Sequence, residues 1–199
     1  MNYSKTQSGF TLVETLVAIT ILMVAIAGPL NIAEKGLTVA ANSRNQTIAS
    51  FLAEDLTEYI QNMRDDNVLA GGSTQWLAMP SGSEVCATGT PCIAETATGN
   101  YSSPSIEQST CTVSPTTSLN NSCALYIDNT YGYYTYNSSG NRQSPFYRTF
   151  TITTPTGLSA VGTNPDSNNI RLLTVRVYWL QGAIQNQVVL QTMIFNTHR

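Results

Sequence analysis

The sequence is short of charge, above all of cations, and it has a single histidine. Charged residues make up 11% of the 199 residues, against about 25% in an average soluble protein. The 9 lysines and arginines are scattered rather than gathered into a basic patch, so we expect no nucleic-acid binding. The histidine, His198, stands next to the C-terminus, where a chain end does not hold a catalytic triad in place.

Catalytic, metal and cofactor motifs are also missing from the sequence. It contains no Cys-x-x-Cys pair, no phosphate-binding loop and no glycine-rich dinucleotide fingerprint. Asp128-Asn129 and Asp166-Ser167-Asn168 offer oxygen ligands, but neither has the spacing of a calcium loop, and turn formation explains both. The sequence therefore predicts no enzyme, no metal site and no cofactor.

Four cysteines lie in the Ser/Thr/Gly/Pro-rich middle of the chain: Cys86, Cys92, Cys111 and Cys123. Four cysteines allow three pairings, of which Cys86–Cys92 with Cys111–Cys123 is the simplest. Zinc sites use closer pairs than these, so we expect disulfides rather than a metal, with free buried thiols as the other alternative. Disulfides indicate a compartment outside the reducing cytoplasm.

The N-terminus joins a polar leader, residues 1–9, to a run over residues 10–33 that is apolar apart from Glu14 and small polar residues. As a helix this run spans about 36 Å, enough to cross a hydrocarbon core about 30 Å thick. A carboxylate there costs about 2.5–3.5 kcal/mol near the bilayer centre, so Glu14 is a candidate functional residue with a partner to be found. Cleavage after Gly9 creates that partner: the new amine of Phe10, four residues earlier, can pair with the carboxylate of a neighbouring copy.

The motif GFTLVE at residues 9–14, followed by the apolar run, resembles the class III signal of type IV prepilins. The resemblance implies cleavage after Gly9 by a prepilin peptidase, N-methylation of Phe10 and a role for Glu14 in assembly. It is close over residues 1 to about 35, and a looser likeness to minor pilins reappears in the strands near the C-terminus.

An ordinary secretory signal is the alternative for the same segment. Ala25-Ile26-Ala27 before Gly28 fits the small-x-small pattern of a signal-peptidase site. Cleavage after Ala27 would release a soluble binding protein. Glu14 and the length of the apolar run would then have no purpose.

Beyond the apolar run, hydrophobic residues recur three or four positions apart, which predicts an amphipathic helix. We expect one helix from about Phe10 to Asp66, broken at Gly28-Pro29, because proline removes a backbone hydrogen bond and clashes with the preceding turn. In a fibre this break is a kink or a turn that melts under load, although membrane helices also tolerate proline without a role for it. The predicted stripe comprises Leu37, Ala40, Ala41, Ile48, Phe51, Leu52, Leu56, Tyr59, Ile60 and Met63.

The rest of the chain predicts loops and then a sheet. Ser/Thr/Gly/Pro-rich sequence from about residue 71 to 121 is expected to form a variable loop region with short strands. The Tyr-rich segment 126–136 is expected to pack in strands rather than form an adhesive surface. Strands are predicted over 124–128, 131–136, 147–153, 170–180 and 188–195, with Leu173, Val175, Val177 and Trp179 on one face. The last two form a hairpin in an antiparallel sheet of three or four strands, which the helix covers.

The sequence thus predicts an α+β protein: a long N-terminal helix, transmembrane and then amphipathic, packed on a C-terminal antiparallel sheet, with a disulfide-pinned loop region between. The predicted divisions are a leader (1–9), a transmembrane and assembly helix (10–33), an amphipathic half-helix (34–67), a loop region (68–123) and a sheet domain (124–199).

The resemblance implies a minor type IV pilin, with a type II secretion pseudopilin as the alternative. Lys5 is expected to keep the leader in the cytosol, so that a single span crosses the inner membrane with the head outside. The implied partners are a prepilin peptidase, other pilins bound through their N-terminal helices, and a membrane assembly platform driven by a cytosolic ATPase.

Overall fold

The structure is a computed structural model, and its chain forms two compact units, residues 1–44 and residues 45–199. It describes residues 9, 11–71, 76–77, 86, 89–97, 106–108, 123–155, 169–182 and 184–196. Each unit is a structural body of its own, and helix α1 (Leu12–Leu69) contributes to both.

Helix α1 has 58 residues and two different surfaces. Its residues up to Arg44 are almost all exposed, whereas from Ala49 onward one face is buried. The buried residues recur three or four positions apart: Ala49, Leu52, Ala53, Leu56, Thr57, Tyr59, Ile60 and Met63. The predicted stripe is therefore confirmed in the second unit. Four residues were wrongly assigned to it: Leu37 and Phe51 are 74% and 64% exposed, and Ala40 and Ala41 are also exposed.

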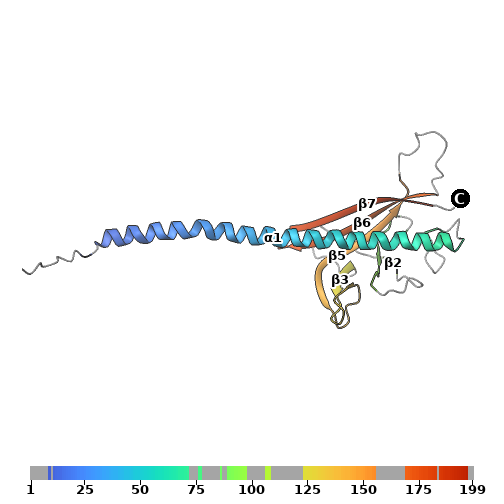
Figure 1. Cartoon of the computed structure of the whole chain (residues 1–199), viewed down its shortest axis with the longest axis horizontal. Coiled ribbons are helices and arrows are strands. Elements are labelled where there is room, and N and C mark those ends of the chain that lie inside the picture. The colour runs from blue at the N-terminus through green and yellow to red at the C-terminus, as the bar shows by residue number, and fades with distance from the viewer. Residues whose placement is uncertain are drawn as a thin grey trace, which may run out of the picture. The chain divides into compact units, whose positions relative to one another are not determined.

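The second unit contains an antiparallel sheet of seven described strands (Figure 1). Their bounds are β1 (Cys92–Ala94), β2 (Ile106–Gln108), β3 (Ala124–Ile127), β4 (Tyr134–Thr135), β5 (Arg142–Thr153), β6 (Ile170–Gln181) and β7 (Ile184–Phe195). Strand β5 is central: β6 and then β7 follow on one side, while β3 and β1 pair with successive parts of its other side. The predicted fold class, one long helix with an antiparallel sheet, is confirmed.

Strands β6 and β7 form the predicted hairpin, paired over their full lengths from Ile170↔Phe195 to Gln181↔Ile184. The turn between them includes Gly182, whose φ of 61° lies in the left-handed region that glycine tolerates best. The predicted inward face of β6 is also confirmed, since its four residues are at most 2% exposed: Leu173, Val175, Val177 and Trp179.

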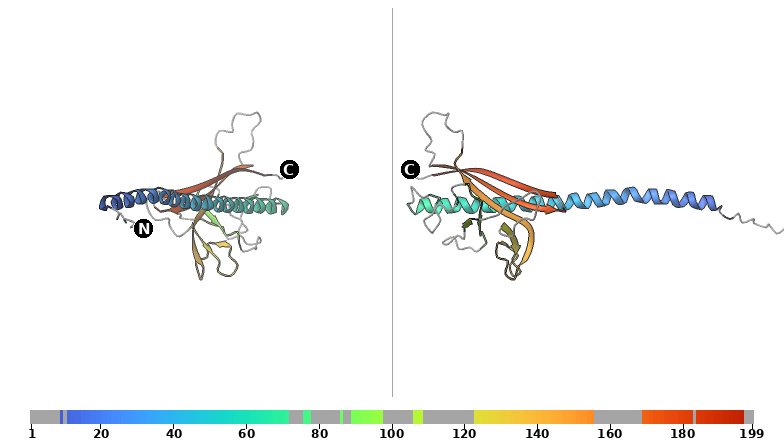
Figure 2. Two further views of the ribbon diagram at one scale, coloured as in Figure 1. Left: turned by 60° about the vertical axis from the view of Figure 1, so that its left-hand side comes forward. Right: turned by 180° about the vertical axis from the view of Figure 1, so that it is seen from behind.

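The sheet is larger than the three or four strands predicted, and one predicted strand is mostly a turn. The short strands β1 and β2 come from the loop region, where sequence pattern is weak. Of the predicted strand 131–136 only Tyr134–Thr135 is extended, because Asp128 accepts backbone hydrogen bonds that fold the preceding residues into a turn. The pairing of β3 with β5 shifts register between Ala124 and Tyr126, where β5 curves toward the β3–β4 hairpin (Figure 2).

The core of the second unit lies between α1 and one face of the sheet. It joins the helix stripe to the inner residues of β5, β6 and β7, together with Trp76 and Leu77 from the segment after the helix. A smaller cluster on the opposite face holds Tyr147 and Tyr178 against Cys123 and Ala124. The amphipathic part of α1 thus covers the sheet as expected.

Candidate functional site

The start of helix α1 is organised around Thr11 and Glu14. The backbone N–H of Glu14 donates to the hydroxyl of Thr11 at 3.3 Å, and the N–H of Thr15 donates to the Thr11 carbonyl at 3.2 Å. Thr11 is therefore the N-cap, and Thr11-x-x-Glu14 has the sequence of a capping box. A carboxylate in the first helical turn is also favoured by the helix dipole. The N-terminus of α1 is therefore an electrostatically favourable position for the Glu14 carboxylate.

The first unit exposes a continuous apolar helix surface. An 18-residue stretch of α1 is long and apolar enough to cross a membrane, and none of it is buried. Residues of every helical face contribute, with exposed fractions from 47% to 80% between Leu12 and Ile32. Such a surface is far larger than a soluble protein leaves uncovered, so it needs lipid or other helices around it.

Polar side chains within this surface are hydrogen-bonded to the helix itself. The hydroxyl of Thr15 donates to the Leu12 carbonyl at 2.9 Å, and that of Thr20 donates to Val17 at 2.8 Å. The amide of Asn31 donates to the Ala27 carbonyl at 2.9 Å. These bonds satisfy polar groups that lipid could not, which suits the segment to an apolar surrounding.

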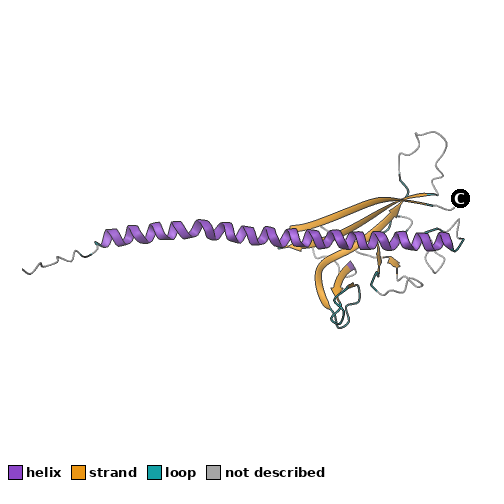
Figure 3. Cartoon of the chain, in the orientation of Figure 1, coloured by secondary structure: helices purple, strands orange, loops and turns teal. Residues whose placement is uncertain are grey.

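The predicted helix break at Gly28-Pro29 is wrong, because α1 passes through both residues without interruption (Figure 3). Proline removes only the bond that its own nitrogen would donate to the carbonyl of Ala25. The hydrogen bonds on either side keep the helix continuous, and no side chain would be crowded at Gly28. The sequence rule overestimated what one missing bond does to a long helix.

The predicted cleavage point lies at the edge of the described residues. Gly9 is exposed, and a Cβ added there would meet no atom within 4 Å. The fold itself therefore does not require glycine at this position. Phe10, like the leader 1–8 with Lys5, lies outside the described residues.

The cysteines are consistent with the simplest predicted pairing as far as the structure describes them. A disulfide joins Cys86 to Cys92, whose Cα atoms lie 6.2 Å apart. Cys92 belongs to β1 and stands opposite Phe150 of β5, so the bond fixes the loop region to the sheet. Cys123 is also disulfide-bonded, but its predicted partner, Cys111, lies outside the described residues.

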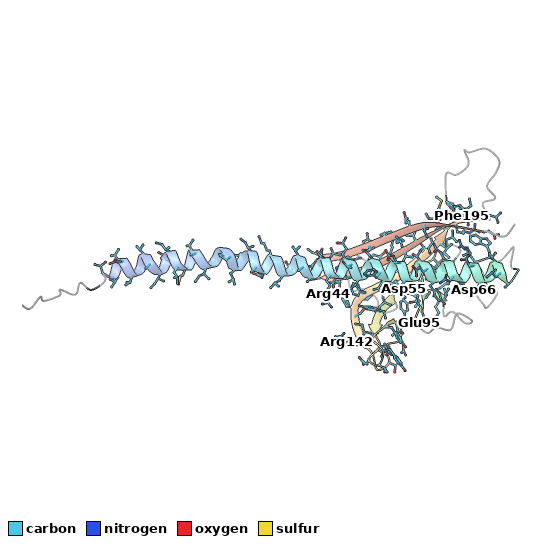
Figure 4. All side chains as sticks on the ribbon, in the orientation of Figure 1. Arg44, Asp55, Asp66, Glu95, Arg142 and Phe195 are labelled. Carbon is cyan, nitrogen blue, oxygen red and sulfur yellow. A yellow bond between two sulfur atoms is a disulfide. The ribbon has the colours of Figure 1, made fainter. Side chains whose placement is uncertain are left out.

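The second unit, residues 45–199, is called the head from here on. Arg148 of β5 connects several of its segments. This arginine is fully buried, and the sequence analysis did not single it out. Its guanidinium has five N–H donors, and each has an acceptor. The acceptors are the Asp55 carboxylate (2.8 Å), the Leu52 carbonyl (3.1 Å), the Ala94 carbonyl (3.3 Å), the Thr96 hydroxyl (3.2 Å) and the Tyr136 hydroxyl (3.2 Å). One side chain thus links α1, the end of β1 and the segment after β4. Asp55 lies on α1, close to the loop that carries Glu95 (Figure 4).

Tyr136 completes this cluster. Its hydroxyl donates to the Arg148 carbonyl at 2.9 Å, and its ring centroid lies 5.6 Å from the guanidinium carbon. Burial raises the pKa of Tyr136, and the positive charge of Arg148 partly opposes the shift. Burial alone would lower the pKa of Arg148, but Tyr136 and Asp55 outweigh it and raise the pKa, so the guanidinium stays charged.

A pattern in the sequence does reveal Arg148 in retrospect. Alternation along β5 puts Arg148 on the same face as Phe150 and Ile152, both at most 2% exposed. An arginine in phase with core residues must find acceptors inside. Its acceptors come from distant segments, so their identity was beyond the reach of the sequence.

Comparison with protein families identifies the N-terminal signal. The apolar part of helix α1 bears an acid at its capped start, and an antiparallel sheet unit follows the helix. Residues 4–28 match the family model described as "Prokaryotic N-terminal methylation motif". The chain thus carries at its N-terminus the class III prepilin signal that type IV pilins and pseudopilins share. That signal implies processing by a prepilin peptidase and assembly with other pilins. No curated protein and no solved structure matches the chain.

Proposed function

We propose that the protein is a minor type IV pilin, a structural or initiating subunit of a pilus fibre. The observation that carries the proposal is the prepilin signal at residues 4–28 joined to a fully exposed apolar helix. Proteins that carry this signal are structural, and we propose no enzymatic activity for this chain.

Processing is proposed to remove residues 1–9 and to methylate the new amine of Phe10. The absence of any packing demand for glycine at Gly9 supports a role for this residue in recognition by the peptidase. Glu14, held in the first turn by the Thr11 cap, then pairs with the Phe10 amine of a neighbouring subunit. Two opposite charges removed from water into a bundle of apolar helices fix the axial register of those helices.

The membrane topology follows from the same segment. Lys5 keeps the leader in the cytosol, residues 10–33 span the inner membrane, and the head lies outside, where its disulfides are stable. Extraction into the fibre by the assembly platform exchanges lipid for neighbouring helices.

A type II secretion pseudopilin is the second candidate, because the same signal serves both machines. The disulfide-pinned loop region and the long strands of the sheet favour an accessory subunit over a repeating subunit of a fibre. Deletion of the chain in its own host distinguishes the two: loss of surface pili supports the minor pilin, whereas loss of protein secretion with normal pili supports the pseudopilin.

The mature N-terminus tests the processing route directly. We expect mass spectrometry of the membrane-extracted protein to show a chain that begins at Phe10 and carries one methyl group. A chain that begins at Gly28 would mean cleavage after Ala27 and a secreted binding protein. A chain that still begins at Met1 would mean a simple anchor, and either result would overturn the assembly mechanism.

A further inference from the structure

The head carries a cavity of about 430 Å³ beside α1, which is within the usual size range of small-molecule sites. Three aromatic residues line it: Phe51 from α1, and Tyr133 and Tyr134 from the β3–β4 hairpin. Ile48 and Leu52 add aliphatic surface, and among the described lining residues the charged one is Asp55, through its carboxylate. All of these residues belong to the second unit.

The surroundings of this cavity carry excess negative charge. Arg148 offsets the charge of Asp55, but it is fully buried and its donors are all engaged within the protein. Within the part of the chain that the structure describes, the Glu95 carboxylate accepts from three neutral groups: the Thr135 hydroxyl and the backbone N–H groups of Tyr136 and Ala97. Asp55 lines the cavity, and the carboxylates of Asp128 and Glu95 act on its wall residue Tyr133. Two guanidiniums oppose these three carboxylates, that of Arg148 and that of Arg142, which lies on β5 beside the hairpin. The net charge of this group is negative, so the field around the cavity favours a cation.

The negative electrostatic potential extends to Tyr133, one of the aromatic residues that line the cavity. Partial desolvation and then the carboxylates of Asp128 and Glu95 raise the pKa of Tyr133. A phenol that is harder to deprotonate beside two carboxylates sits in negative potential. The same potential would stabilise a positive charge held against its ring.

The hairpin holds the two tyrosines in place. The ring of Tyr131 stacks on that of Tyr133 with centroids 6.1 Å apart and an interplanar angle of 7°. The N–H of Asp128 donates to the Tyr133 carbonyl at 2.9 Å, and the Asp128 carboxylate accepts from the N–H of Tyr131 at 2.7 Å. Tyr134 packs edge-on against the buried ring of Phe146. Aromatic walls fixed before binding need little ordering when a ligand enters.

We propose that this cavity binds a small organic cation of the methylated ammonium class. Aromatic faces attract such cations while tolerating their methyl groups, which makes aromatic cages their usual recognition site. A metal ion fits less well, since the described residues contain no group of three or more metal-ligating side chains. The proposal stands on the head alone and does not depend on whether the fibre is a pilus or a pseudopilus.

A pair of ligands matched in shape tests the role of charge. Choline and 3,3-dimethylbutan-1-ol differ in that a trimethylammonium group of the first is a tert-butyl group in the second. We titrate the full chain with each ligand by NMR in an uncharged maltoside detergent. The detergent contains no phosphatidylcholine, because that lipid carries the choline group itself. Each dissociation constant is calculated from the concentration of ligand that is free in solution. Choline is expected to bind about tenfold more tightly than the alcohol. Equal affinities would show an apolar cavity only and overturn the proposal.

Substitutions in the wall test the location. Tyr133→Leu and Phe51→Leu keep apolar bulk but remove the ring, and each should weaken choline binding by about three- to tenfold. Phe195→Leu removes a ring that is 48% exposed on β7 and should leave binding unchanged. Because Phe51 is 64% exposed, Phe51→Leu should unfold at the same urea concentration as the wild type. A loss of choline binding in this variant can then not be due to misfolding. If all three substitutions weakened choline binding equally, or if none of them weakened it, the proposed location of the site would be refuted.

Removing a carboxylate tests the field. Asp128→Asn keeps a side-chain oxygen to accept the turn hydrogen bonds but removes one negative charge. Choline affinity should fall by about two- to fivefold and that of the alcohol should not change. A parallel loss for both ligands would mean that the hairpin had moved, and no loss for choline would mean that charge does not select the ligand.

Discussion

The guanidinium of Arg148 on β5 and the carboxylate of Asp55 on α1 meet at 2.8 Å, with the arginine side chain fully buried and that of the aspartate 52% exposed. The two residues are 93 positions apart in the chain. Their contact joins the helix to the sheet at the place where the loop region also arrives, through Ala94 and Thr96. The pair therefore holds the helix against the sheet and is a structural clasp of the head.

Arg148→Met is expected to destabilise the head strongly. The substitution removes five hydrogen bonds and leaves the buried Ala94 carbonyl without this donor, while half-exposed Asp55 can regain water. We expect a loss of about 3 kcal/mol in the free energy of unfolding, at the low end for a broken buried pair. Urea unfolding followed by tryptophan fluorescence measures it.

Arg142→Met is the matched control, because Arg142 is exposed on the same strand and lies near the β3–β4 hairpin in Figure 4. Its effect should stay within about 0.5 kcal/mol. Asp55→Asn keeps an acceptor and should cost only about 1 kcal/mol, since half-exposed pairs are screened by water. If Arg148→Met cost no more than Arg142→Met, the clasp would be structurally unimportant.

Removal of the described disulfide should have a moderate effect. Cys86 and Cys92 are six positions apart, so the bond closes a short loop. Loop-closure entropy alone predicts that Cys86→Ala/Cys92→Ala lowers the free energy of unfolding by about 2 kcal/mol. The double substitution leaves the bond of Cys123 in place. An unchanged urea midpoint would show that β1 is held by its pairing with β5 and by Arg148 rather than by the disulfide.

The stability of the head should fall at alkaline pH, partly through Tyr136. The pKa of this phenol is raised in the folded state by burial, against the opposing charge of Arg148 and with Glu95 and Asp55 adding to the rise. The protonated phenol is thus favoured by folding. Its contribution is complete below the unfolded pKa of about 10 and is lost as the pH rises through the folded value.

Tyr136→Phe isolates that contribution. At pH 7 the variant should be less stable by about 1–3 kcal/mol, because two hydrogen bonds with Arg148 are lost. Above pH 10 the difference in free energy of unfolding between the wild type and the variant should become smaller, since only the wild type loses stability when Tyr136 ionises. Tyr131→Phe, which alters a ring 80% exposed, serves as the control. A gap that widened above pH 10 would contradict the raised pKa.

The sequence predicted those parts of the fold whose pattern is long and regular. The face of β6 formed by Leu173, Val175, Val177 and Trp179 followed from a period of two, and the helix stripe followed from a period of about 3.6. The acid in the apolar run could be singled out because a charge there is costly. These features depend on local chemistry that each segment carries by itself.

The features that were missed depend on contacts between distant segments. Strands β1 and β2 are three residues each, too short for periodicity to show, and β1 is defined by its partners and by Cys92. The helix continues through Pro29 because its other hydrogen bonds are sufficient, which a single-residue rule cannot judge. Phe51 was assigned to the stripe by spacing, whereas it lines the cavity with Tyr133 and Tyr134.

Glu14→Gln should separate processing from assembly. The cleavage point at Gly9 and the cap residue Thr11 are unchanged, and a glutamine at the third helical position keeps the capping sequence. We therefore expect the variant to be cut and methylated at Phe10 as in the wild type, which mass spectrometry of the membrane fraction checks. In the fibre, however, the neighbouring Phe10 amine would lose its counter-charge within apolar helices. Breaking a buried pair in this way costs about 3–5 kcal/mol, so the amount recovered in sheared fibres should fall at least about a hundredfold.

Glu34→Gln is the control for this prediction, because it removes an exposed carboxylate from the same helix beyond the predicted membrane span. Its recovery in fibres should equal that of the wild type. Loss of processing in Glu14→Gln would assign the acid to recognition by the peptidase. Normal processing with normal fibre recovery would mean that the amine needs no partner, and the axial register of the subunits would then have to come from packing of the apolar helices alone.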